Sequence, residues 1–128
     1  TLSHGELRSA AALADELLAA AQRDGGRGGL VLAHLSQGVT RYYRGHATSS
    51  AEHLERVIAL YDEEDHRFMP NDPGVMALCY HGLLDVYRGL PETAMRWSDR
   101  ARELALRLGK PYDAAWAEAT ATAAFHIH

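Results

Sequence analysis

Eight of the 128 residues are histidines, the side chains that most often bind transition metals and exchange protons near neutral pH. Neither a His-Glu-x-x-His motif nor a pair of cysteines accompanies them, and only His126-Ile127-His128 brings two of them close in the sequence. We therefore expect histidines at the surface and at helix ends and no metal site, with structural zinc as the alternative. Five further candidates are scattered along the chain: His34, His46, His53, His66 and His81.

Two other segments contain residue types that could form a ligand site. The run Asp62-Glu63-Glu64-Asp65-His66 could bind a divalent cation through carboxylates, but it lacks the spacing and central glycine of a calcium loop. The glycines between Gly25 and Gly29 come closest to a phosphate-binding loop, but no strand precedes them. We expect the acidic run to be a solvated loop and the glycine segment to be a turn between helices. Since no nucleophile motif is present either, the sequence predicts no enzyme and no cofactor, and a metal-assisted hydrolase is the third alternative.

The composition narrows the class of protein. A formal net charge of -4 and the absence of a Lys/Arg cluster argue against nucleic-acid binding, and the apolar runs are too short to span a membrane. Abundant alanine and leucine predict an all-α fold in one domain over residues 1–128. The single cysteine, Cys79, fits a small core residue and a cytoplasmic location. Without an initiating Met or a leader, we expect a fragment of a larger protein.

An internal repeat indicates which elements position the side chains. The pattern G-x-x-x-x-Y-R-G occurs from Gly38 to Gly45 and again, 44 positions later, from Gly82 to Gly89. Repeats of this length are typical of stacked helix pairs that cannot bury their apolar faces alone. Apolar residues at helical spacing predict about six helices, the first over 6–23, the last over 112–125, joined as antiparallel pairs in an α-solenoid.

Local signals place the helix ends and contacts. Gly45 and Gly89 are expected to end the first helix of each pair. Pro91 is expected to begin the helix after Gly89, and Ser49 or Ser50 to cap the helix after Gly45. The polar segment 62–73 is expected to be a long loop. Gly38 and Gly82 lie inside helices, where glycine is unfavourable, so we expect close approach of the paired helix at both positions.

The glycine spacing, followed by Ala94 and Ala101 in the next helix, resembles the tetratricopeptide pattern, although the period is 44 instead of 34 and the usual aromatic residues of the first helix are displaced. Further segments resemble the helical-repeat regions that follow an ATPase module in large bacterial regulators linked to cyclase or kinase domains. They are His53-Leu54-Glu55, Tyr61-Asp62, His66, Asp72-Pro73-Gly74-Val75, Leu90-Pro91 and Leu108-Gly109-Lys110-Pro111. The resemblance covers residues 38–125 and implies a regulatory or scaffolding segment.

A second, polar stripe beside the apolar one predicts a binding groove for a protein or peptide, because repeat proteins commonly bind partners on the face formed by their first helices. An alternative is that these side chains are ordinary solvent-facing residues, with Arg41 paired to Asp85. The last helix is expected to expose Trp116, Ala119, Ala123 and Phe125, for a following repeat or a homodimer. The rival function is a small-molecule sensor in which an apolar pocket between helix pairs binds a ligand and changes the curvature of the superhelix. The predicted groove residues are His34, Gln37, Arg41, Tyr43, His81, Asp85 and Tyr87.

Overall fold

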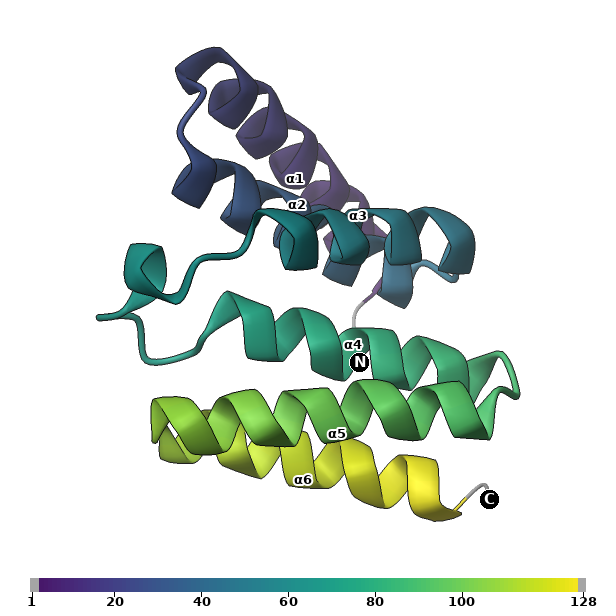
Figure 1. The fold of residues 1–128 in the computed structure, drawn as a ribbon. Helices are drawn as coiled ribbons and strands as arrows, with labels where there is room; N and C mark the ends of the chain where they lie inside the picture. The colour runs from purple at the N-terminus through teal and green to yellow at the C-terminus, as the bar shows by residue number, and fades with distance from the viewer. Residues whose placement is uncertain (1–2, 127–128) are drawn as a thin grey trace. The chain divides into compact units, whose positions relative to one another are not determined.

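The computed structural model describes residues 3–126, which form six α-helices and one short 3₁₀ helix and contain no strand (Figure 1). The all-α prediction and the number of helices are confirmed, and the first and last helices lie within two residues of their predicted bounds. The elements are α1 (His4–Asp24), α2 (Arg27–Tyr43), α3 (Ala47–Leu60), η1 (Glu63–His66), α4 (Pro73–Tyr87), α5 (Pro91–Leu108) and α6 (Pro111–His126).

The chain divides into two compact units, Thr1–Asp62 and Glu63–His128. The single domain expected from the sequence stays a prediction. In the first unit α2 packs against both α1 and α3. In the second unit α4, α5 and α6 all pack on one another. The first unit is therefore arranged around α2, whereas the second is a three-helix cluster (Figure 1).

Helix boundaries repeat with the period of the sequence. α2 ends at Tyr43 and α4 ends at Tyr87, 44 positions later. The helices that follow begin at Ala47 and Pro91, which are also 44 positions apart. The sequence repeat therefore corresponds to the same helix–turn–helix segment in each unit.

A left-handed glycine ends the first helix of each segment, as predicted. The φ angle is 80° at Gly45 and 73° at Gly89, a region that glycine occupies without the steric cost of a β-carbon. The residue after each glycine donates its backbone N–H to the carbonyl five residues earlier, which completes a Schellman motif. These two bonds join His46 to Arg41 at 2.9 Å and Leu90 to Asp85 at 2.8 Å.

Both mid-helix glycines lie where the following helix approaches closely. A β-carbon at Gly38 would lie 2.6 Å from Cδ2 of Leu54. One at Gly82 would lie 3.2 Å from Oγ of Ser98 and 3.1 Å from Cγ2 of Thr120. Leu54 and Ser98 are again 44 positions apart, so the predicted close approach is confirmed at both positions and uses equivalent partners.

Two local predictions differ from the structure. α3 begins at Ala47 after His46, which has no side-chain capping bond, so neither proposed serine is the cap. Ser50 lies one turn inside α3, where its hydroxyl donates to the Gly38 carbonyl at 2.6 Å. The predicted loop over 62–73 contains the short helix η1, and its end is ordered by Asp72, whose carboxylate accepts the Val75 N–H at 3.0 Å and caps α4.

Candidate functional site

Two of the predicted groove residues, Gln37 and Arg41, form a hydrogen-bonded chain that runs from α2 to its neighbouring helices. Gln37 is buried and donates from Nε2 to Asp15 of α1 at 2.7 Å, while its Oε1 accepts from Nε of Arg41 at 3.0 Å. Arg41 also donates from Nη1 to the Ser49 hydroxyl of α3 at 3.2 Å. These side chains therefore connect the three helices of the first unit, which sequence spacing alone does not indicate.

His34 lies close to His53 of α3. The two Nδ1 atoms are 3.0 Å apart, a hydrogen bond in which one ring must donate and the other accept. The pKa of each histidine is lowered, mainly by burial. Nearby basic side chains lower it further: His53 and Arg56 act on His34, and Arg41 acts on His53. The geometry requires at least one neutral ring, so the pair can respond to acid.

In the second unit His81 and Asp85 occupy the positions equivalent to Gln37 and Arg41, and both are buried. The His81 ring stacks on Trp97 of α5 with ring centroids 4.0 Å apart. Asp85 accepts from Nη2 of Arg88 at 2.8 Å, and its second oxygen lies 3.9 Å from Nδ1 of His81. This cluster joins α4 to α5 and neutralises a buried carboxylate.

Burial divides the predicted groove into two groups. His34, Gln37, His81 and Asp85 are buried, so these four side chains neither line an accessible groove, as predicted, nor face solvent, as the alternative had it. The reason is that helices contact α2 and α4 over a wider arc than the predicted apolar stripe.

The exposed members are two tyrosines. Tyr43 is 49% exposed and Tyr87 is 78% exposed, and each is the last residue of its helix. Each tyrosine lies directly before one of the two Schellman turns, at Gly45 and Gly89, which have the same backbone conformation. Tyr43 and Tyr87 are hereafter called the corner tyrosines.

The first unit also contains a cavity that sequence analysis did not predict. Its volume is about 320 Å³. It lies where the start of α1 meets the turn between α2 and α3, and its lining is mostly basic. The lining residues are His4, Leu7, Arg8, Tyr43, Arg44 and His46. The available signals were the i, i+4 spacing of His4 and Arg8 and the two basic residues that flank Gly45, but only the packing of α1 shows that they meet.

Arginines pair with the acidic segment that was considered as a cation site. Asp62 accepts from Arg27 at 3.1 Å in the first unit. In the second unit Glu63 pairs with Arg107 at 2.9 Å, and Glu64 pairs with Arg67 at 3.4 Å. Over residues 3–126 no three His, Cys, Asp or Glu side chains are grouped so as to hold a metal ion. The segment His126-Ile127-His128 lies outside the side chains that the structure describes.

On α6 the side chain of Trp116 contacts Tyr80 of α4, with ring centroids 5.7 Å apart, so this tryptophan is half-buried where full exposure was expected. The face that packs into the unit contains Asp113, Ala117, Thr120 and Ala124. Phe125, which is 67% exposed, was correctly expected at the surface. A cavity of about 100 Å³ beside Phe125 is too small for most organic ligands.

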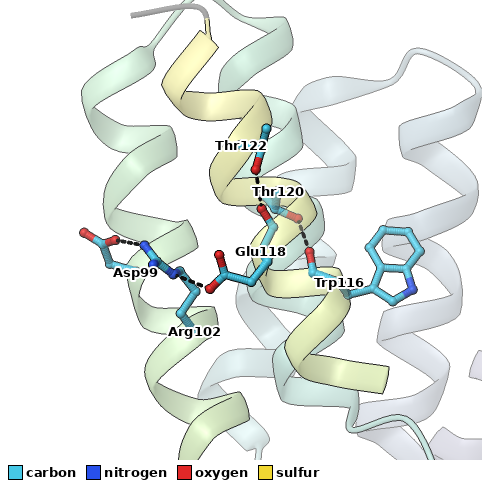
Figure 2. Close-up of polar contacts among 6 residues, drawn as sticks. All are labelled: Asp99, Arg102, Trp116, Glu118, Thr120 and Thr122. Carbon is cyan, nitrogen blue, oxygen red and sulfur yellow. Dashed lines mark hydrogen bonds and ion pairs between the residues drawn. The ribbon is translucent and has the colours of Figure 1, made fainter. Parts of the chain in front are cut away.

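Figure 2 shows how α6 is tied to α5. Arg102 donates from Nε to Glu118 at 2.9 Å and lies 3.6 Å from Asp99, while Trp116 projects from the other side of α6. The hydroxyl of Thr120 donates to the Trp116 carbonyl at 3.0 Å, within α6. Because Arg102 and Glu118 are partly exposed, this ion pair positions the helices with little net stabilisation.

Asp113 and Cys79 are two buried ionisable side chains of the second unit. Both oxygens of Asp113 accept from the Asp72 N–H at 3.1 Å. Burial raises the pKa of Asp113, although the bond from the Asp72 N–H opposes that rise. Cys79 is buried as predicted, and burial raises the pKa of its thiol to about 11, so it is protonated at neutral pH.

Comparison of the chain with protein-family models, curated protein sequences and solved structures found no match. None of the helices between residues 3 and 126 is long and apolar enough to cross a membrane.

Proposed function

We propose that this chain is a protein-interaction module built from tetratricopeptide-like helix pairs, with a regulatory or scaffolding role and no catalytic role. In the same proposal it belongs to a larger cytoplasmic bacterial signalling or transcription regulator and binds a protein or peptide, not nucleic acid or membrane. The resemblance of residues 38–125 to such helical-repeat regions motivates this part of the proposal.

One observation supports the interaction role above the others. The corner tyrosines occupy equivalent positions at two turns of the same geometry, and both are exposed. Tyrosine is enriched among residues that dominate binding energy at protein interfaces, because its rigid ring buries a large area at low entropic cost. Each unit therefore has its own proposed contact residue: Tyr87 in the second unit, and Tyr43 in the first, where the half-buried Arg41 contributes where its aliphatic part is accessible.

Site-specific crosslinking tests this surface. A photoreactive phenylalanine analogue would replace Tyr43 or Tyr87 in the full chain, and Tyr112, a tyrosine on α6 that is 56% exposed, provides the matched control. We expect one protein from the source cell to crosslink from both corner positions and not from position 112. Equal crosslinking from all three positions, or from position 112 alone, would exclude the corner tyrosines as the contact surface.

The rival function, a small-molecule sensor, is favoured by a different observation, the cavity of about 320 Å³ in the first unit. Its size lies at the lower end of the range for small-ligand sites, about 300–1,000 Å³. For homodimerisation through α6, the supporting observation is the exposure of Ala119 and Phe125. Sedimentation of the chain at increasing concentration tests it, and a monomer at every concentration would exclude it.

A further inference from the structure

We propose that the cavity in the first unit is a binding site for a small organic phosphate, a phosphate monoester with a compact apolar group. The site would consist of His4, Leu7 and Arg8 from the first two turns of α1, and of Tyr43, Arg44 and His46 around the turn after α2. This site needs no protein partner, so it goes beyond the proposed interaction role and is tested separately from it.

The charge of the lining points to an anion. Four of the six lining residues are arginine or histidine, and none is acidic. Glu6 is the nearest acid to them along α1, but it is two residues from both His4 and Arg8, so it projects from a different side of the helix. In a chain with a formal net charge of -4, a concave surface with four basic and no acidic lining residues requires a specific reason.

Five of the other ten arginines are already engaged in ion pairs, which strengthens this point. Ion pairs at 2.8–3.4 Å hold Arg27, Arg67, Arg88, Arg102 and Arg107. Among residues 3–126, in contrast, the side chains of Arg8 and Arg44 have no hydrogen bond and no ion pair, and the same holds for His4 and His46. The two guanidinium groups therefore keep all their donors for a ligand.

Phosphate fits this arrangement better than carboxylate does. A phosphate monoester has about two negative charges at neutral pH and three strong acceptor oxygens, which suits two arginines and two histidines. Guanidinium groups bind phosphate through two parallel hydrogen bonds, a geometry that lysine cannot provide. His46 also precedes α3, whose first turn contains no acidic residue, so the positive end of that helix adds to the same field.

The remaining lining residues indicate the rest of the ligand. Leu7 and the ring of Tyr43 line the same cavity as the basic groups. An apolar side chain and an aromatic face beside a cationic cluster favour an organic group attached to the phosphate over the inorganic ion. The volume of about 320 Å³ limits that group to roughly the size of one aromatic ring with its substituents.

Calorimetric titration of the full chain tests the proposal, with phenyl phosphate as the probe. We expect saturable binding that is several-fold tighter than that of inorganic phosphate, because the ring adds apolar burial. Benzoate, which has the same ring and one charge, should bind at least about tenfold more weakly than phenyl phosphate. No heat of binding with phenyl phosphate at millimolar concentration, or equal affinity for benzoate, would overturn the proposal.

Variants locate the binding and separate it from general charge effects. Arg8→Ala and Arg44→Ala should each weaken phenyl phosphate binding by roughly tenfold or more, since each loses a charge-assisted bidentate contact. Arg23→Ala is the matched control, because it removes the same charge from the other end of α1, about 22 Å away by the helical rise. An equal loss in Arg23→Ala would show nonspecific attraction and would refute the site.

Two further arms keep the result interpretable. Arg8→Lys and Arg44→Lys retain charge and fold but lose the bidentate geometry, and we expect intermediate affinity. Unchanged binding in both lysine and both alanine variants, with native circular dichroism, would overturn the assignment. If a phosphotyrosine peptide binds more than about tenfold tighter than phenyl phosphate, the ligand is a phosphoprotein and the small-molecule proposal is overturned. Loss of crosslinking at the corner tyrosines leaves all these outcomes unaffected.

Discussion

Replacing Gly38 by alanine tests the helix packing of the first unit directly. Alanine is the better helix former by about 1 kcal/mol, so helix propensity alone predicts stabilisation. The structure predicts the opposite sign. A β-carbon at position 38 would lie 2.6 Å from Cδ2 and 2.8 Å from Cγ of Leu54, whereas carbon atoms in contact are separated by about 3.5–4.0 Å.

The overlap with Leu54 sets the magnitude. Leu54 is 0% exposed, so its side chain cannot move into solvent to make room. Overpacking a buried site costs about 1–3 kcal/mol, and a displacement of roughly 1 Å against a fully buried leucine belongs at the upper end. After the gain in helix propensity of about 1 kcal/mol is subtracted, Gly38→Ala should lower the free energy of unfolding by about 1–2 kcal/mol.

Urea unfolding followed by far-ultraviolet circular dichroism measures this loss, and Gly29→Ala is the control. Gly29 lies on the same helix, but a β-carbon there would meet only Ala21, at 4.0 Å, so this variant should be unchanged or more stable. Leu54→Ala should restore space for the new methyl group, so the double variant Gly38→Ala/Leu54→Ala should lose less stability than the sum of the single losses. A Gly38→Ala protein as stable as the wild type, or additive losses in the double variant, would refute the close approach.

Four further outcomes follow from individual side chains. Burial lowers the pKa of His34 and His53 below 6.5 in the folded chain, so below that pH the unfolded chain binds more protons than the folded chain. The urea midpoint should therefore be constant above neutrality and decrease below about pH 6.5. A midpoint independent of pH would contradict the buried pair. Asp113→Asn should leave the urea midpoint at neutral pH unchanged or raise it, since burial disfavours the carboxylate. Asp113→Ala should lower the free energy of unfolding by about 1–3 kcal/mol, because the Asp72 amide loses its acceptor. Equal effects of the two variants would be inconsistent with that bond. Cys79 should react with a thiol reagent at mildly alkaline pH only after unfolding, and rapid reaction of the native chain would show that it is not buried. Arg102→Ala should cost less than about 1 kcal/mol in the same urea assay, and a larger loss would mean that the pair with Glu118 is less solvated than its exposure indicates.

The local elements could be predicted because their causes are local. Glycine after a helix, as at Gly45 and Gly89, has a backbone conformation that few other residues tolerate, so the two helix ends are readable in the sequence. The period of 44 then locates equivalent turns without any knowledge of packing. The start of α3 was predicted less well, because the capping preference of Ser49 and Ser50 did not decide where the helix begins.

The candidate sites depended on contacts between helices. Gln37 and Asp85 are polar residues beside an apolar stripe, and sequence spacing places them equally well in a groove or in a buried hydrogen-bond network. Gln37 finds its partner, Asp15, on another helix, whereas Arg88 follows Asp85 by three positions and donates to one of its two oxygens. Polar residues in a core need partners, and a partner from another helix cannot be identified by the spacing within one helix.

By itself, the sequence determined that the chain is helical, where most of its helices end and which turns are equivalent, because propensity, apolar periodicity and glycine conformation act over a few residues. Only the tertiary structure decided which residues of α2 and α4 remain exposed, and it alone brought Arg8 to Arg44. The physical reason is that burial and electrostatic environment are properties of the space between helices, and that space depends on how closely residues such as Gly38 and Leu54 allow the helices to approach.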